Sequence, residues 1–192
     1  KPPGATLAEV QDLTTRAAAN GVTLYTTWHS RMAKGVAAAK AFLADKTITS
    51  GYIDWREDVR RWHPEQEWVF EPGGMGVFDP GINALSILTD VLPRPVHITS
   101  ALLNFPENRF TPIAAEVAFS GNLTMTLDWL KDGQQMWEMI LRAGDDQVHL
   151  SEGGNRCVIN GTEVAGSVLD EYPALYDQMA RLVSSGASEV DL

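Results

Sequence analysis

The stretch "NLTMTLDWL", residues 122–130, alternates apolar and polar side chains without a break. Leu123, Met125, Leu127 and Trp129 point to one side, and only threonine and aspartate separate them. Successive side chains of a strand point to opposite faces, so this pattern predicts a half-buried strand. A strand of this kind is typical of an antiparallel sheet with one face open to solvent.

Strand-like stretches continue on both sides of this segment. "ITSGYIDWRE" (48–57), "QMWEMILRA" (135–143) and "RCVINGTEV" (156–164) are rich in β-branched and aromatic residues, and Asn160-Gly161 predicts a two-residue hairpin turn. Helical spacing predicts helices over residues 31–46, 80–92 and 170–184. The fold class expected is therefore α+β, with an open, mainly antiparallel sheet and helices on one face.

The first thirty residues follow a different pattern. "TLAEVQDLTTRAAANGV" (6–22) predicts an amphipathic helix with a capping box from Thr6 to Glu9 and a stop at Asn20-Gly21. "VTLYTTW" (22–28) predicts a short strand. Helix, strand and helix with short connections are typical of the end of a parallel α/β layer.

Composition excludes several classes of protein. The formal net charge of −10 argues against a nucleic-acid partner, because phosphate binding needs a basic surface. The longest apolar runs are shorter than the ~20 residues of a membrane span, so no membrane partner is expected. The single cysteine, Cys157, fits a buried strand position and a reducing, cytoplasmic setting. The chain opens on "KPPG" without methionine, and we expect a fragment cut on both sides.

The stretch "EPGGMGVFDPGINAL", residues 71–85, holds the first candidate site residue. Asp79 precedes Pro80, which is the pattern of a helix N-cap with proline at the first helical position. The glycines before it allow close approach to another body, and Asn83 lies one helical turn further on. Asp79 therefore either caps the helix or grips a polyhydroxylated ligand together with Asn83.

Aromatic residues gather just before this stretch. Trp55, Trp62, His63 and Trp68 lie close together, and they either pack in the core or stack on sugar rings beside carboxylates. His29 follows the strand-like stretch, where α/β sheets place ligands, although a lone histidine also has a structural role in many proteins.

Four segments together resemble a known family: "KPP", "TLYTTWHSR", "DWREDVRRWHP" and "GGMGVFDPGINAL". They are similar to the Gfo/Idh/MocA oxidoreductases, and among these to the bacterial aldose 1-dehydrogenases that act on L-arabinose and D-galactose. The resemblance implies that residues 1–30 are the end of a Rossmann dinucleotide-binding domain. Residues 31–192 would form the substrate-binding α+β domain, and the rest of the Rossmann domain and a C-terminal tail would lie outside the chain.

The resemblance also implies roles for individual residues. Lys1 and Asp79 match catalytic positions. The sugar-binding positions are Asn83, His29, Glu57 and Trp62, and the cofactor-binding positions are Lys1, Trp28 and Arg31. The implied cofactor is NAD or NADP, with NADP slightly preferred. The Gly-rich phosphate-binding fingerprint is absent, so we expect this fragment alone to be inactive.

The implied reaction oxidises C1 of an aldose to the aldonolactone, with hydride transfer to the nicotinamide and the proton shared by Asp79 and Lys1. Two other functions stay open. Asp54, Glu57 and Asp79 could supply the carboxylate pair of a glycoside hydrolase. The same fold could also serve as a non-catalytic sugar-binding or assembly domain. The expected partners are a small-molecule aldose and further copies of the chain, joined in a homo-oligomer through the sheet face.

Overall fold

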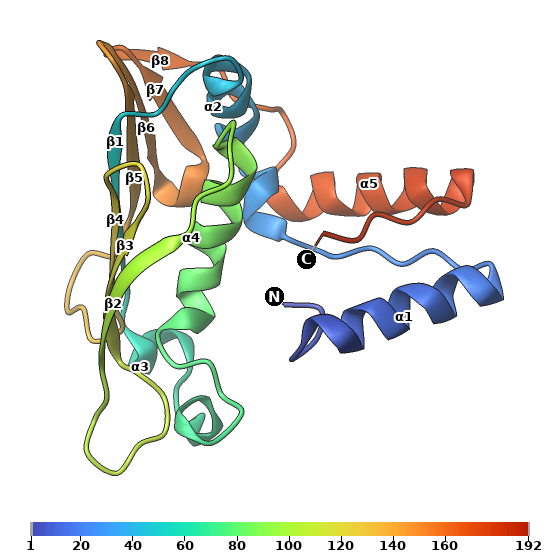
Figure 1. The fold of residues 1–192 in the computed structure, drawn as a ribbon, viewed down its shortest axis with the longest axis horizontal. Coiled ribbons are helices and arrows are strands. Elements are labelled where there is room, and N and C mark those ends of the chain that lie inside the picture. The colour runs from blue at the N-terminus through green and yellow to red at the C-terminus, as the bar shows by residue number, and fades with distance from the viewer. Residues whose placement is uncertain (1, 192) are drawn as a thin grey trace.

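The computed structural model describes residues 2–191, which form a sheet layer, a helical layer on one of its faces, and two helices that stand apart (Figure 1). The α-helices are α1 (Leu7–Asn20), α2 (Val36–Leu43), α3 (Val59–Trp62), α4 (Phe78–Val91) and α5 (Glu171–Ser185). The 3₁₀ turns are η1 (His29–Met32), η2 (Glu67–Phe70) and η3 (Glu152–Gly154). The strands are β1 (Ser50–Arg56), β2 (Ile98–Asn104), β3 (Ala114–Phe119), β4 (Leu123–Asp128), β5 (Met136–Ala143), β6 (Asp146–Ser151), β7 (Arg156–Ile159) and β8 (Thr162–Val164).

The eight strands form one open sheet in the order β2-β3-β4-β1-β5-β6-β7-β8. Only the β1–β4 pair is parallel, and the other neighbours are antiparallel. In β4 the alternation read from the sequence holds, since Leu123, Met125 and Leu127 are each 1% exposed. The predicted fold class, an open and mainly antiparallel sheet with helices on one face, is confirmed.

Helices α2 and α4 cover the inner face of the sheet (Figure 1). Helix α4 comes close to β4 at Gly81, where an added Cβ would lie 2.7 Å from Leu127 Cδ1. The apolar side of α4 and the inward side chains of the central strands share one core. At the sheet edge, Asn160 and Gly161 form the turn that connects β7 to β8. Their φ angles are 50° and 80°, as expected of a two-residue hairpin. Cys157 is buried in β7, also as expected.

The predicted helix over residues 31–46 is wrong in its first part, because the structure has η1 there and α2 begins only at Val36. The break lies at Gly35, whose amide donates to Gly154 O at 2.8 Å. A Cβ on Gly35 would lie 2.7 Å from Cys157 Cβ. Contact with the sheet edge therefore sets the start of the helix, and the local apolar pattern does not show it.

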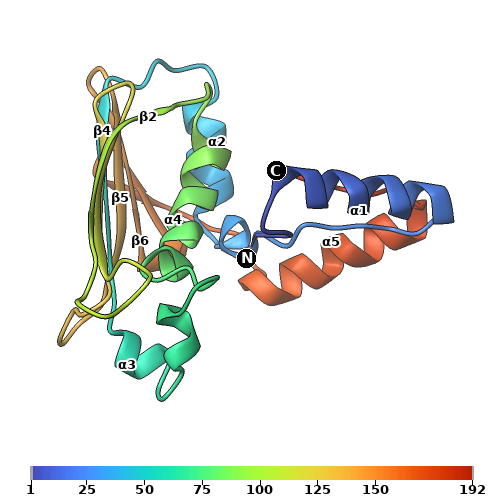
Figure 2. The same cartoon turned by 60° about the horizontal axis from the view of Figure 1, so that its bottom comes forward.

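Helices α1 and α5 both lie away from the sheet, and the segment that joins α1 to η1 runs between them in both views (Figures 1 and 2). Helix α1 has the predicted cap, with Glu9 N donating to Thr6 Oγ1 at 3.2 Å, and it ends at Gly21 in a left-handed conformation. The predicted strand over residues 22–28 is limited to one bridge, from Tyr25 to Glu189, and the backbone turns at its end, where Trp28 N donates to Thr26 O at 3.1 Å. A strand needs a partner along its length, and residues 2–191 supply one only here. The division into residues 1–30 and 31–192 stays a prediction.

No helix within residues 2–191 is long and apolar enough to cross a membrane.

Candidate active site

The glycine-rich loop before α4 places Asp79 inside the first turn of the helix. Helix α4 begins at Phe78, and Asp79 N donates to Gly76 O at 2.9 Å. The residue before the helix, Val77, makes no side-chain cap, and so the alternative that Asp79 is the N-cap is wrong. Asp79 follows the cap position, and its carboxylate bonds to a side chain outside the helix.

The glycines of this loop make close contacts with the chain itself. A Cβ on Gly74 would lie 2.5 Å from Val69 O, and one on Gly76 would lie 2.4 Å from Pro112 O. Gly76 also has a φ of 55°, a conformation that glycine adopts without strain. The close approach expected at these glycines is thus an approach to residues 69 and 112, and it fixes where α4 starts.

The partner of Asp79 is His63, which follows α3. His63 Nε2 lies 3.1 Å from Asp79 Oδ2, and its Nδ1 lies 3.1 Å from Gln66 Oε1. Both side chains of the pair are largely shielded, at 19% and 15% exposure. The imidazole packs edge-on against Trp129 and Trp68, with ring centroids 5.4 and 6.1 Å away. A histidine held against a carboxylate in this way can carry or pass a proton at Nε2.

Glu57 is a buried carboxylate held by two indoles. Trp129 Nε1 donates to Glu57 Oε1 at 3.2 Å, and Trp137 Nε1 donates to Oε2 at 3.1 Å. Glu57 is only 7% exposed, so these charge-assisted bonds offset part of the cost of removing the carboxylate from water. Each oxygen has further acceptor capacity for a ligand hydroxyl.

The aromatic residues divide between core and surface. Trp55 is buried at 4% exposure, and its Nε1 has no hydrogen-bond partner among the described residues. Trp62 is 45% exposed, and its ring centroid lies 5.9 Å from that of Trp137. Trp68 is 58% exposed. Trp55 therefore packs in the core, as one of the two expectations has it, and stacking of Trp62 or Trp68 on a sugar ring stays a prediction.

His29 opens η1 and meets the start of α5. Its ring stacks on Tyr172, with centroids 5.5 Å apart and planes at 11°. His29 Nε2 lies 3.9 Å from Glu171 Oε2 and 3.3 Å from Ser30 Oγ. Burial raises the pKa of the Glu171 carboxyl above its usual range, and a hydrogen bond from Asn155 opposes this in part.

Most of these groups line one cavity of about 450 Å³, which we call the α4 cavity, whereas Trp68 and Trp129 are not in its wall. Five of the predicted site residues lie in its wall: His29, Glu57, Trp62, Asp79 and Asn83. Trp55 and His63, which the sequence analysis placed in the aromatic loop, lie in the wall too. The wall also contains residues that the sequence did not point to, among them Trp137, Glu152, Asn155, Glu171 and Tyr172. Ring-bearing and polar side chains in one concave site are typical of a small-molecule pocket.

A second cavity of about 530 Å³ borders the first. Its wall includes Pro2, Gly4, Trp68 and Met75, and it shares Asp79 with the α4 cavity. Asp79 therefore belongs to the walls of both cavities. Lys1, the other predicted catalytic residue, is outside the described residues.

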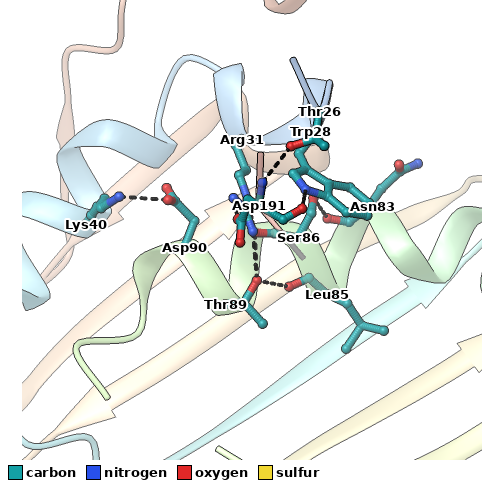
Figure 3. A network of polar contacts seen from close by, with 10 residues as sticks. All are labelled: Thr26, Trp28, Arg31, Lys40, Asn83, Leu85, Ser86, Thr89, Asp90 and Asp191. Atoms are coloured by element: carbon teal, nitrogen blue, oxygen red, sulfur yellow. Dashed lines mark hydrogen bonds and ion pairs between the residues drawn. The ribbon is translucent and has the colours of Figure 1, made fainter. Parts of the chain in front are cut away.

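Trp28 and Arg31 lie outside the wall of the α4 cavity. Arg31 Nε donates to Ser86 O at 2.9 Å, and its guanidinium pairs with Asp191 (Figure 3). Trp28 Nε1 donates to Asp191 O at 3.4 Å. These bonds tie the C-terminal stretch to the middle of α4. The predicted contact of Trp28 and Arg31 with a cofactor stays a prediction.

Asp54, one of the carboxylates considered for glycoside hydrolysis, does not line the α4 cavity. It lies on β1 between Ile53 and Trp55, which point inward, so its own side chain projects from the opposite face and pairs with Arg56. No group of metal-ligating side chains with suitable spacing occurs in the part of the chain that the structure covers.

Comparison with known proteins gives relatives over most of the chain. A curated galactose 1-dehydrogenase of Pseudomonas fluorescens is 39% identical over 164 residues, which cover 83% of this chain and 54% of the relative. The crystal structure of D-galactose-1-dehydrogenase from Rhizobium etli superposes with a TM-score of 0.91 at 49% identity, covering 100% of this chain and 62% of that one. This chain is similar to galactose 1-dehydrogenases over most of its length.

The predicted resemblance to Gfo/Idh/MocA oxidoreductases, and within them to aldose 1-dehydrogenases, is thereby confirmed. The chain spans between half and two thirds of the length of these two galactose dehydrogenases. A more distant structure, the 3-ketoreductase KijD10 of Actinomadura kijaniata with NADP and TDP-benzene, shares the fold, with a TM-score of 0.75 at 13% identity. The superposition covers 98% of this chain and 63% of KijD10. No family model matches the chain.

Proposed function

We propose that the complete protein containing this chain oxidises the anomeric C1 hydroxyl of a galactose-type aldose to the aldonolactone, with NAD or NADP as hydride acceptor. The observation that carries this proposal is the convergence of Asp79, Asn83, His29, Glu57 and Trp62 on one cavity, in a chain 49% identical to a D-galactose-1-dehydrogenase. The sugar would lie in the α4 cavity, with C1 facing Asp79.

The pyrophosphate of the cofactor is proposed to bind outside this chain. Its sequence lacks the Gly-rich turn that holds a pyrophosphate at a helix N-terminus. The site for the cofactor's pyrophosphate is therefore proposed to lie in the remainder of the complete protein, whereas Lys1, Trp28 and Arg31 stay the predicted cofactor contacts of this chain. NADP rather than NAD stays the preferred prediction. When bound, the nicotinamide accepts the hydride that leaves C1.

The residues of this chain would accept the proton of the anomeric hydroxyl and position the sugar ring. Oxidation at C1 releases the proton of the anomeric hydroxyl, and Asp79 is placed to accept it because its carboxylate lines the cavity and lies 3.1 Å from His63. His63 stabilises the negative charge of the Asp79 carboxylate before the proton is transferred to it. Lys1 is the second proposed proton group, by resemblance, and Pro2 next to it lines a cavity together with Asp79.

Glu57, Asn83 and Trp62 would position the sugar. Glu57 accepts from hydroxyls while the two indoles hold it in place, and Asn83 lies one turn along α4 from Asp79. The exposed ring of Trp62 offers a stacking surface for the C–H face of a pyranose. A soluble cytoplasmic location and a homo-oligomer formed through the sheet face stay predictions.

The test is the absorbance of reduced nicotinamide when the complete protein meets a panel of aldoses with NAD and with NADP. We expect turnover with D-galactose or L-arabinose and little with sugars of other configuration. Hydrolysis of glycosides without any nicotinamide would instead support a glycoside hydrolase. Absence of turnover, together with an unchanged cellular role for Lys1→Ala, would support a sensor or assembly domain.

A further inference from the structure

One wall of the α4 cavity comes from α5, which belongs to the part of the molecule that stands apart from the sheet (Figure 1). Glu171 and Tyr172, in the first turn of this helix, line the cavity opposite residues of β1 and α4. They lie more than eighty positions from Asp79 in the sequence, and the proton chemistry described above does not use them.

The carboxylate of Glu171 is set among cavity residues. His29 Nε2 lies 3.9 Å from it, and Tyr172 stacks on the His29 ring and holds it in place. The Glu171 side chain is 21% exposed. A partly shielded carboxylate gains from hydrogen-bond donors, and Glu171 has more acceptor positions than the Asn155 amide fills.

The position of Glu171 along the cavity is given by η1 and α4. Arg31 of η1 donates to Ser86 O of α4, so η1 packs at the level of Ser86. Ser86 lies seven residues beyond Asp79, which is about 10 Å along the helix axis. Asn83 lies between the two levels. His29, which opens η1, and Glu171 beside it therefore lie nearer the middle of α4 than Asp79, which is in the first turn of that helix.

The rest of the wall fits a neutral, hydroxyl-bearing group. Among residues 2–191, no lysine or arginine lines the cavity, whereas four carboxylates do: Glu57, Asp79, Glu152 and Glu171. Trp55 contributes a buried N–H donor that has no partner among the described residues. Hydroxyls both donate and accept, so they match such a wall, and a phosphate or carboxylate does not.

We propose that Glu171 is a specificity-determining residue that accepts a hydrogen bond from the sugar hydroxyl on carbon 4 or carbon 6, at the end of the pyranose away from the reacting C1. His29, stacked on Tyr172, lies beside this carboxylate, with Nε2 3.9 Å from its Oε2. This assignment rests on the proposed function, since it takes the sugar to be bound with C1 at Asp79. It gives the helix that stands apart from the sheet a direct part in sugar recognition.

The test compares Glu171→Gln with the wild-type complete protein on D-galactose and its 2-deoxy, 4-deoxy and 6-deoxy analogues. Loss of a bond to a charged acceptor lowers kcat/KM for D-galactose by about 10- to 100-fold. That loss should disappear with either the 4-deoxy or the 6-deoxy sugar and persist with the 2-deoxy sugar. Asp170→Asn is the matched control, because the neighbouring Asp170 is exposed, pairs with Lys34 and lies outside the cavity wall. We expect it to behave as wild type.

An undiminished effect of Glu171→Gln with both the 4-deoxy and the 6-deoxy sugars would overturn the assignment, and so would the absence of any effect with D-galactose. If the wild type reduces no nicotinamide, the proposed function fails by itself. The same sugars are then compared by their quenching of tryptophan fluorescence, since Trp55, Trp62 and Trp137 line the cavity. Equal affinities of wild type and Glu171→Gln for every sugar would overturn the assignment there too.

Discussion

The hydrogen bond from Trp129 to Glu57 is predicted to stabilise the fold around the α4 cavity. Trp129 is fully buried, Glu57 is 7% exposed, and Trp129 Nε1 donates to Glu57 Oε1 at 3.2 Å. Trp129→Phe keeps an aromatic ring in the core and removes the N–H. One oxygen of a buried carboxylate then loses its donor, while the other keeps its bond from Trp137.

The expected cost follows from the charge and the burial. A hydrogen bond to a charged group contributes about 1.5–3 kcal/mol, and the variant loses that contribution from Trp129. For a domain of this size, each kcal/mol corresponds to about 2–4 °C in Tm, so the variant should melt about 3–12 °C lower. The smaller ring adds a packing loss that does not depend on Glu57.

A double-mutant cycle with Glu57→Met separates the two contributions. Free energies of unfolding of the wild type, the two single variants and the double variant are measured by urea titration with circular dichroism. We expect a coupling energy of about 1–3 kcal/mol between the two positions. Trp68→Phe is the control, because Trp68 is 58% exposed, and it should change stability by less than about 0.5 kcal/mol. If the two single losses simply add up in the double variant, the bond has no role in stability and the reasoning is refuted.

Three further predictions concern α4 and α5. Asp79→Asn should lower kcat of the complete protein by about 10²- to 10⁴-fold with unchanged circular dichroism, because the amide cannot take the proton; a loss below tenfold in nicotinamide reduction would contradict this. Gly81→Ala should cost about 1–3 kcal/mol in urea unfolding, because the new Cβ would lie 2.7 Å from Leu127 Cδ1. Burial raises the pKa of the Glu171 carboxyl in the folded state. The ionised carboxylate therefore lowers the stability of the fold at pH values above that raised pKa, and it has no such effect below the pKa of the unfolded state. Glu171→Gln should therefore raise Tm at neutral pH, and the gain should shrink as the pH falls through the acidic range; a gain independent of pH in calorimetry would contradict it.

Local sequence patterns determined most of the secondary structure of this protein. The alternation in residues 122–130, the Asn160-Gly161 turn and the capping box at Thr6 each depend on neighbours a few positions away. Asp79 and Asn83 share one side of α4 for the same reason, because residues four apart on a helix lie one above the other. Those properties follow from backbone geometry and could be predicted from the sequence alone.

Contacts between elements were decided by the tertiary structure. His63 reaches Asp79 across 16 positions, Trp129 reaches Glu57 across 72, and α5 brings Glu171 to the same cavity from the far end of the chain. No spacing in the sequence indicates such pairs, because periodicity specifies which side of an element a residue occupies and not which element packs against that side. The start of α4 one residue before Asp79 has the same origin: Gly76 fits against Pro112, and that contact sets the first helical turn.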